Sequence, residues 1–222
     1  MGKNEVAVSL LNVDVEGAIS LFYNLETAKI DYFHIDVMDG VFVENYTHDK
    51  MYEFATTLAN ITNIKQDIHL MVKDVKKYVD IYSSLGRNRI SFHVEAFDTS
   101  EEIIDMINYI KDTGNQVGLA VSPDTGIDEI YPYLPYIHCV IVMTVQPGKG
   151  GQTIIEDTIT KITYLRNAIN EFNNDIDIEA DGGIKDTNAE LVRNAGANIL
   201  IAGTYIVKNP NLTEAVRKIR GQ

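Results

Sequence analysis

The chain has 222 residues, of which 45% are hydrophobic and 23% are charged, and this ordinary globular composition excludes extensive disorder. Its formal net charge of −13 argues against nucleic acid or an anionic membrane surface as a partner, because both favour clustered Lys and Arg side chains. The single cysteine, Cys139, excludes a disulfide within the chain and is expected in the core.

Short β-rich runs alternate with longer helical patterns along the chain. The predicted strands are 6–11, 32–38, 66–71, 89–94, 116–121, 139–145, 175–180 and 198–203. The predicted helices are 14–29, with Asp14 as its N-cap, 50–60, 75–84, 100–113, 158–173, 187–195 and 211–220. Between the fifth and sixth strands, Pro132 and Pro135 are expected to break any helix.

Eight strands that alternate with helices indicate a parallel sheet. Eight is also the number of strands that closes a (β/α)8 TIM barrel, and the chain is close to the typical length of about 250 residues for that fold. A doubly wound open sheet is the competing topology. Because no linker or low-complexity stretch divides the chain, residues 1–222 are predicted to form a single barrel domain.

Polar side chains occur where the predicted strands should be apolar. Strand side chains alternate between faces, so His34 and Asp36 share one face, as do Glu179 and Asp181, and His69 lies near the end of a third strand. In a closed barrel these faces can all turn inward at the carboxyl ends of the strands, where such barrels place their active sites. Two histidines and two carboxylates converging there suit a divalent metal such as Zn²⁺.

Each of these polar residues also has a purely structural interpretation. A single His-x-Asp in a strand is commonly a satisfied polar pair, and His69 alone could be a core histidine. His93 and Glu95 satisfy the same alternation on a fourth strand. Spacing therefore predicts a polar cluster at the barrel mouth without choosing among its members.

Glycines follow three successive strands, in 147–152, 181–183 and 202–204. Glycine lets backbone N–H groups approach an anion closely, and in TIM barrels the loops after the last strands often bind phosphate. A phosphate site is predicted there.

Taken together, these motifs resemble the ribulose-phosphate 3-epimerase family over nearly the full chain. The matching stretches are HIDVMDGVFV, HLMV, FHVEA, VMTVQPGKGGQ, EADGGI and AGTYIV. The resemblance implies a ribulose-phosphate-binding barrel, a homo-oligomer, and one divalent metal ion per site, with Zn²⁺ expected and Fe²⁺, Mn²⁺ or Co²⁺ as alternatives. It also implies an isomerase of carbohydrate metabolism that acts in the pentose phosphate pathway.

The resemblance assigns roles to individual residues. The implied metal ligands are His34, Asp36, His69 and Asp181. The implied catalytic acid/base pair is Asp36 and Asp181, which leaves His93 and Glu95 outside the metal set. The implied substrate-binding residues are Ser9, His69, Met38, Met71, Met143, Gly148, Lys149, Gly150, Gly151, Gly183, Gly203 and Thr204.

The chain departs from the family pattern at several positions. Val8 replaces a proline before Ser9, the segment 44–50 is unusually charged, and Thr204 replaces a serine. Lys149 stands where an aromatic residue is common, and it could contact the phosphate or face solvent. These departures leave the identity of the substrate open, although they do not touch the implied metal and acid/base residues.

The expected activity is interconversion of D-ribulose 5-phosphate and D-xylulose 5-phosphate by two-carboxylate proton transfer at C3 through an enediolate. The alternatives are a 3-epimerase of a hexulose 6-phosphate such as allulose 6-phosphate, and a non-catalytic sugar-phosphate-binding barrel. A barrel aldolase or decarboxylase is disfavoured, because no predicted strand carries a lysine for a Schiff base. No apolar stretch approaches the roughly 20 residues of a membrane span, and no signal peptide is evident, so a cytoplasmic protein is expected.

Overall fold

The computed structural model describes residues 4–171 and 175–222 and contains a closed barrel of parallel strands. The strands are β1 (Glu5–Ser9), β2 (Tyr32–Met38), β3 (Lys65–Met71), β4 (Arg89–His93), β5 (Gln116–Val121), β6 (Cys139–Met143), β7 (Asp177–Asp181) and β8 (Ile199–Ile201). They are hydrogen-bonded in sequence order, and β8 pairs with β1 to close the ring. The predicted TIM barrel is therefore confirmed, and the open sheet is excluded.

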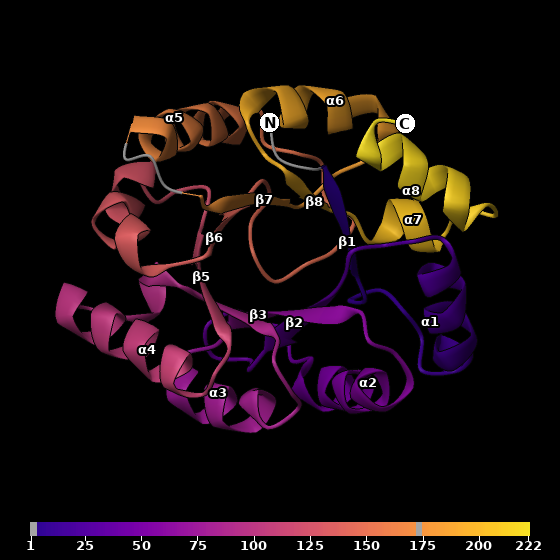
Figure 1. The fold of residues 1–222 in the computed structure, drawn as a ribbon, viewed down its shortest axis with the longest axis horizontal. Coiled ribbons are helices and arrows are strands. Elements are labelled where there is room, and N and C mark those ends of the chain that lie inside the picture. The colour runs from indigo at the N-terminus through magenta and orange to yellow at the C-terminus, as the bar shows by residue number, and fades with distance from the viewer. Residues whose placement is uncertain (1–3, 172–174) are drawn as a thin grey trace.

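Helices surround the strands in an outer ring (Figure 1). The α-helices are α1 (Ala18–Thr27), α2 (His48–Ile61), α3 (Val75–Ser83), α4 (Ser100–Asp112), α5 (Asp157–Glu171), α6 (Asp186–Ala195), α7 (Thr204–Val207) and α8 (Leu212–Arg220). Two 3₁₀ helices, η1 (Val94–Ala96) and η2 (Ile127–Tyr136), complete the described elements. None of the helices built from these residues combines the length and the apolar character that a bilayer crossing requires.

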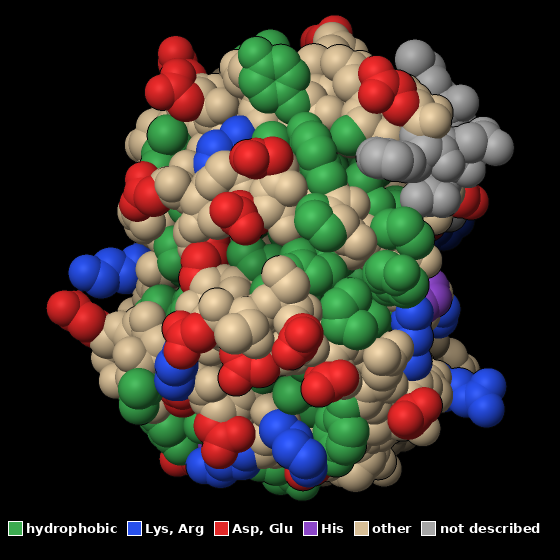
Figure 2. Space-filling view, turned by 90° about the vertical axis from the view of Figure 1, so that its left-hand side faces the viewer, with side chains coloured by type: hydrophobic (Ala, Val, Ile, Leu, Met, Phe, Trp, Pro, Cys, Tyr) green, Lys and Arg blue, Asp and Glu red, His purple; other side chains and the backbone are tan. Residues whose placement is uncertain are grey.

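The main apolar core lies between the outer faces of the strands and the inner faces of the helices. Alternate strand residues such as Ile35 and Val37 point into this layer and are fully buried, so the intervening residues of β2 point into the barrel. Cys139 is also fully buried, as expected. Acidic side chains are spread over the flank of the molecule in Figure 2, in keeping with the net charge of −13.

Most predicted elements are present, with differences at their ends. The first helix was predicted to start at Asp14, which is wrong, because α1 begins at Ala18 after Gly17, whose φ of 82° is left-handed. The segment with the two prolines forms the 3₁₀ helix η2, since proline lacks the N–H that an α-helix needs. The single-turn helix α7 was not predicted. Residues 172 and 173, the end of a predicted helix, lie outside the described residues.

Candidate active site

Four polar side chains meet at the carboxyl ends of three strands. The register of β2 and β3 places Asp36 beside His69, and His34 precedes Asp36 by two residues on the same face. Asp181 is the last residue of β7 and reaches the same point from across the barrel. One ligand atom from each of the four residues lies within 4.8 Å of the others. The structure thus brings together all four residues that were predicted as metal ligands.

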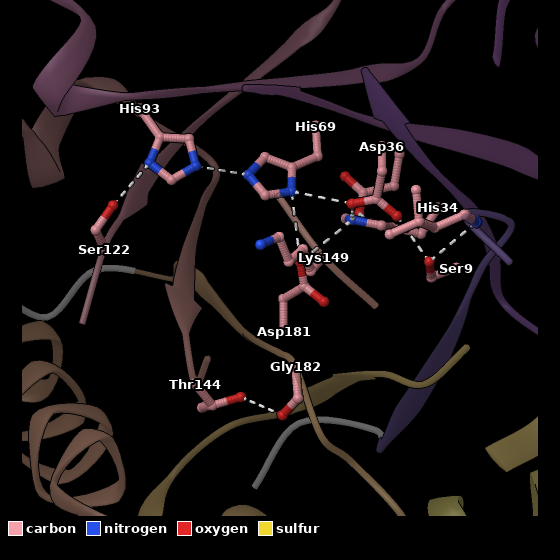
Figure 3. Close-up of polar contacts among 12 residues, drawn as sticks. Ser9, His34, Asp36, His69, His93, Ser122, Thr144, Lys149, Asp181 and Gly182 are labelled. Atoms are coloured by element: carbon pink, nitrogen blue, oxygen red, sulfur yellow. Dashed lines mark hydrogen bonds and ion pairs between the residues drawn. The ribbon is translucent and has the colours of Figure 1, made fainter. Parts of the chain in front are cut away.

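The geometry inside this cluster suits a cation. His34 Nε2 lies 3.2 Å from Asp36 Oδ1 and 3.6 Å from Asp181 Oδ2. His69 Nδ1 lies 3.5 Å from Asp36 Oδ1 and 3.4 Å from Asp181 Oδ2 (Figure 3). Within the described part of the chain, these two buried imidazole nitrogens have no hydrogen-bond partner of acceptable geometry. Two unpartnered imidazole nitrogens and two carboxylates that face one another fit a divalent metal ion.

Two neighbouring side chains hold the cluster in place. Ser9, at the end of β1, donates its hydroxyl to Asp36 Oδ2 over 2.7 Å. His34 Nδ1 donates to Asp67 Oδ2 over 2.6 Å, which leaves its Nε2 facing the carboxylates of Asp36 and Asp181. Such an outer carboxylate is the common partner of a metal-binding histidine.

A second set of acidic side chains lies deeper in the barrel, where the Arg89 guanidinium supplies a compensating positive charge. His34, Asp67 and Glu179 also place ligand atoms within 4.8 Å of one another. The Arg89 guanidinium, however, donates to Glu179 Oε1 over 2.5 Å. Burial and the adjacent charge of Asp67 raise the pKa of Glu179 to about 8. Glu179 was predicted to share a face with Asp181, but it belongs to this lower layer of the barrel and does not line the pocket.

The two histidines and two aspartates of the cluster shift one another's pKa values. Burial by itself would raise the pKa of Asp36, but the adjacent imidazoles of His34 and His69 hold it well below its usual range. Burial would also raise the pKa of Asp181, but interaction with the same two rings lowers it. Burial would lower the pKa of both His34 and His69, yet the carboxylates around them raise it. In the absence of metal and substrate, both carboxylates therefore favour the ionised form.

A pocket of about 300 Å³ opens above the cluster. All of the predicted substrate-binding residues line it except His69, whose ring is fully buried beneath it. Those lining residues are Ser9, Met38, Met71, Met143, Gly148, Lys149, Gly150, Gly151, Gly183, Gly203 and Thr204. Asp36 and Asp181 line the same pocket, so the two carboxylates and the glycine-rich loops face one space.

The glycine-rich loops are tightly packed around this pocket. Gly183 has a left-handed φ of 68°, and a Cβ there would lie 2.6 Å from the backbone nitrogen of Ile154. Asn45 donates its side-chain N–H to the carbonyl of Gly148 over 2.6 Å. The contact at Gly183 explains why that turn uses glycine, and the Asn45 bond ties the loop after β6 to the segment after β2.

The charged segment that departs from the family pattern is partly structural. Thr47 donates its hydroxyl to the carbonyl of Asp36 over 2.6 Å and accepts the N–H of Met38 over 2.9 Å. Lys50 donates to the carbonyl of Leu11 over 2.7 Å. Through these contacts the segment supports β2 and the loop after β1. The Lys50 ammonium is directed at a backbone carbonyl.

Several residues near the site were not singled out from the sequence. Asp67 could have been found, because it shares the face of His69 two residues away. Thr144 donates its hydroxyl to the carbonyl of Gly182 over 2.6 Å, and its N–H to that of Asp181 over 2.7 Å. Other missed residues at the site are Asn12, which donates to the Thr204 hydroxyl, and Lys185, which lines the pocket. They carry no signal that distinguishes them from ordinary loop residues.

Strand spacing could not decide whether His93 and Glu95 belong to the polar cluster. In the structure they lie behind His69, outside the four converging residues. His93 Nε2 is 3.0 Å from His69 Nε2, on the side of the His69 ring that faces away from the carboxylates. Glu95 lies in η1 and contacts His93. Neither residue is among the four that converge on the candidate metal site.

A parallel eight-stranded barrel with paired carboxylates and glycine-rich loops at its carboxyl-terminal mouth defines a TIM-barrel enzyme. The solved 3-keto-L-gulonate-6-phosphate decarboxylase of Vibrio cholerae shares this fold, with a TM-score of 0.73 and 14% identity over 99% of this chain and 98% of that one.

The profile of the Ribulose-phosphate 3 epimerase family matches residues 5–207. The chain is 35% identical to the ribulose-phosphate 3-epimerase of Chlamydia muridarum, over 98% of this chain and 95% of the relative. It is 34% identical to that of Synechocystis, over 99% and 95% respectively. The chain therefore belongs to the ribulose-phosphate 3-epimerase family, a family of isomerases.

Proposed function

We propose that this chain is a metal-dependent 3-epimerase that interconverts D-ribulose 5-phosphate and D-xylulose 5-phosphate. The observation that carries the proposal is the convergence of two histidines and two aspartates within 4.8 Å, in a member of this family. Two of the converging atoms are buried imidazole nitrogens without a hydrogen-bond partner in the described residues. A site built only for rigidity would leave no such donors unpaired.

The four residues would hold one divalent ion through His34 Nε2, His69 Nδ1, Asp36 Oδ1 and Asp181 Oδ2. Zn²⁺ is the proposed metal, and Fe²⁺, Mn²⁺ and Co²⁺ accept the same donors. When bound, the ion supplies positive charge that stabilises negative charge developing on the substrate oxygens.

The proton transfers fall to the two aspartates. Epimerisation at C3 removes a proton next to the C2 carbonyl and returns a proton to the opposite face of the same carbon. Asp36 comes from β2 and Asp181 from β7, so their carboxylates enter the pocket from different parts of the barrel wall. With substrate bound, one aspartate would be ionised and accept the C3 proton, while the other would already be protonated and supply its own proton to the opposite face, which needs no redox cofactor. The Ser9 hydroxyl, bonded to Asp36 Oδ2, orients that carboxylate.

The rest of the pocket suits a sugar phosphate. We assign the phosphate to the loops that contain Gly183 and Gly203, with Lys149 and Lys185 as nearby cations on the pocket lining. Three nearly buried methionines, Met38, Met71 and Met143, also line the pocket. They would pack against the carbon chain and keep water away from the intermediate.

Solvent exchange tests the proposal directly. The protein is incubated in D₂O with D-ribulose 5-phosphate, and separately with allulose 6-phosphate, and deuterium entry at C3 is followed by NMR with and without a strong chelator. We expect chelator-sensitive exchange and appearance of D-xylulose 5-phosphate. Faster exchange on allulose 6-phosphate would instead assign the hexulose substrate. Absence of exchange on both sugars by folded, metal-loaded protein would reject the activity.

Two variants test the two-base mechanism. Asp36→Asn and Asp181→Asn should each abolish turnover, because an amide neither accepts nor supplies the proton at C3. Asp98→Asn, at an exposed position, is the matched control and should keep wild-type turnover. Turnover near the wild-type rate in either site variant contradicts the mechanism. Homo-oligomeric assembly and the extent of a single domain stay predictions.

A further inference from the structure

A line of polar side chains leads from the four-residue cluster to Glu95 in η1. His69 presents Nδ1 to the two aspartates, and its Nε2 lies 3.0 Å from His93 Nε2. The two rings lie edge to edge and close to coplanar, with centroids 5.1 Å apart and planes inclined by 21°. His93 Nδ1 in turn lies 3.0 Å from Glu95 Oε2. Figure 3 shows the two rings in line with the cluster, and both are fully buried.

Glu95 sets the direction of the hydrogen bonds along this line. Its Oε1 accepts the backbone N–H of Ser122 over 2.8 Å, so the carboxylate is already used as an acceptor. A carboxylate cannot donate, and therefore His93 must carry its proton on Nδ1 and donate it to Oε2. A neutral His93 then has a bare Nε2, which can only accept, and His69 must donate from Nε2.

The opposite arrangement fails at the outer end of the line. If His93 carried its proton on Nε2 and donated it to His69, its bare Nδ1 would face the Glu95 carboxylate at 3.0 Å. Two acceptors would then meet in a buried position, which is costly. The Ser122 hydroxyl, 3.4 Å from His93 Nδ1, is a longer contact than the carboxylate. For a neutral His93, only one set of proton positions satisfies both the inner and the outer contact.

We propose that Glu95 and His93 are positioning residues that hold His69 with its proton on Nε2 and its Nδ1 lone pair facing the metal site. This inference rests on the proposed function in so far as Nδ1 is taken as a metal ligand. His34 Nδ1 is hydrogen-bonded directly to a carboxylate, that of Asp67, over 2.6 Å. His69 Nε2 instead contacts the imidazole of His93. His93 thus relays to His69 the orienting effect that a carboxylate usually exerts directly.

A glutamine at position 95 has nearly the shape of glutamate but cannot serve both neighbours. Its amide offers one acceptor oxygen, while the Ser122 N–H and the His93 Nδ1–H each need one. If the amide N–H faces His93, that ring must move its proton to Nε2, and His69 must then carry its proton on Nδ1. The metal-facing lone pair is lost in that case. If the amide N–H faces Ser122, two donors meet instead.

The experiment compares the wild type with Glu95→Gln and with Glu129→Gln as matched control. Glu129 is exposed and lines the same small outer pocket as Glu95. Its replacement by glutamine removes the same negative charge from the same region. The first readout is the protonation of the His93 ring in metal-free protein, from long-range ¹H–¹⁵N NMR of the five histidines. The second is Zn²⁺ affinity, from competition with a chromophoric chelator.

We expect His93 protonated on Nδ1 in the wild type and the control. Glu95→Gln should bind Zn²⁺ about 10- to 100-fold more weakly, and Glu129→Gln should bind it as tightly as the wild type. A wild-type His93 protonated on Nε2 overturns the inference even if Glu95→Gln does not fold. Equal Zn²⁺ affinity of folded Glu95→Gln and wild type overturns it as well.

The two readouts also separate this inference from the proposed function. Wild-type protein that shows the expected His93 tautomer but binds no Zn²⁺ would reject the metal-dependent mechanism, and with it the metal-positioning role. A wild type that binds Zn²⁺ and epimerises normally, with His93 in the other tautomer, would reject the positioning role alone.

Discussion

The buried carboxylate of Glu95 should also contribute pH-dependent stability. Burial would raise its pKa, but the hydrogen bond from His93, with contacts from Thr125 and the Ser122 N–H, lowers it from 4.5 to about 2. Each pKa unit corresponds to about 1.4 kcal/mol, so the ionised group stabilises the fold by about 3 kcal/mol near pH 7. Glu95→Gln should lose most of this contribution.

The sign follows from proton binding in the two states. Because the folded pKa lies below the unfolded one, the unfolded chain binds more protons, and stability falls as the pH is lowered from about 4.5 toward about 2. The difference between wild type and Glu95→Gln should therefore shrink from about 3 kcal/mol near pH 7 to about 1.5 kcal/mol near pH 3.

Urea unfolding at the two pH values measures this difference. The protein is kept metal-free with a chelator, because a bound metal adds its own stabilisation to the folded state. Glu129→Gln, at an exposed position, should stay within about 0.5 kcal/mol of the wild type throughout. A destabilisation by Glu95→Gln that is the same near pH 7 and near pH 3 refutes the reasoning, since an unshifted carboxyl group adds no pH dependence.

Three further variants probe neighbours of the site. Asp67→Asn should weaken Zn²⁺ binding about 10-fold or more in a chelator competition, because His34 loses its charged partner; unchanged affinity would contradict this. Thr144→Val should lower the urea-derived free energy of unfolding by about 1–2 kcal/mol, since the Gly182 carbonyl loses its donor; an effect near zero would show that water replaces it. Gly183→Ala should cost more than about 1 kcal/mol and lower the Tm, because its φ of 68° and a Cβ 2.6 Å from a backbone nitrogen both disfavour a side chain.

Local periodicity accounts for what could be predicted of the fold. The strands 32–38 and 116–121 have the predicted bounds, because a buried parallel strand is a short apolar run between polar turns. Ends and short elements were harder to predict. One helical turn, such as α7, is too short to show a 3.6-residue period, and the start of α1 depends on a left-handed glycine.

The four converging residues could be inferred because alternation along a strand is strictly local. His34 and Asp36 share a face whatever the rest of the chain does, and the resemblance to the family singled out His69 and Asp181. Alternation also admitted His93, and nothing in the spacing indicated that it would lie behind His69. The roles of these residues in catalysis stay predictions.

By itself, the sequence determined which residues point into the barrel, because side-chain direction in a strand depends only on backbone geometry. The tertiary structure decided which of those residues meet, because distances across a barrel depend on strand register and on closure between β8 and β1. Closure brings Asp181 from β7 to the histidines of β2 and β3, and the register of β3 with β4 brings His69 and His93 together. These pairings join residues far apart in the chain, so no local pattern encodes them.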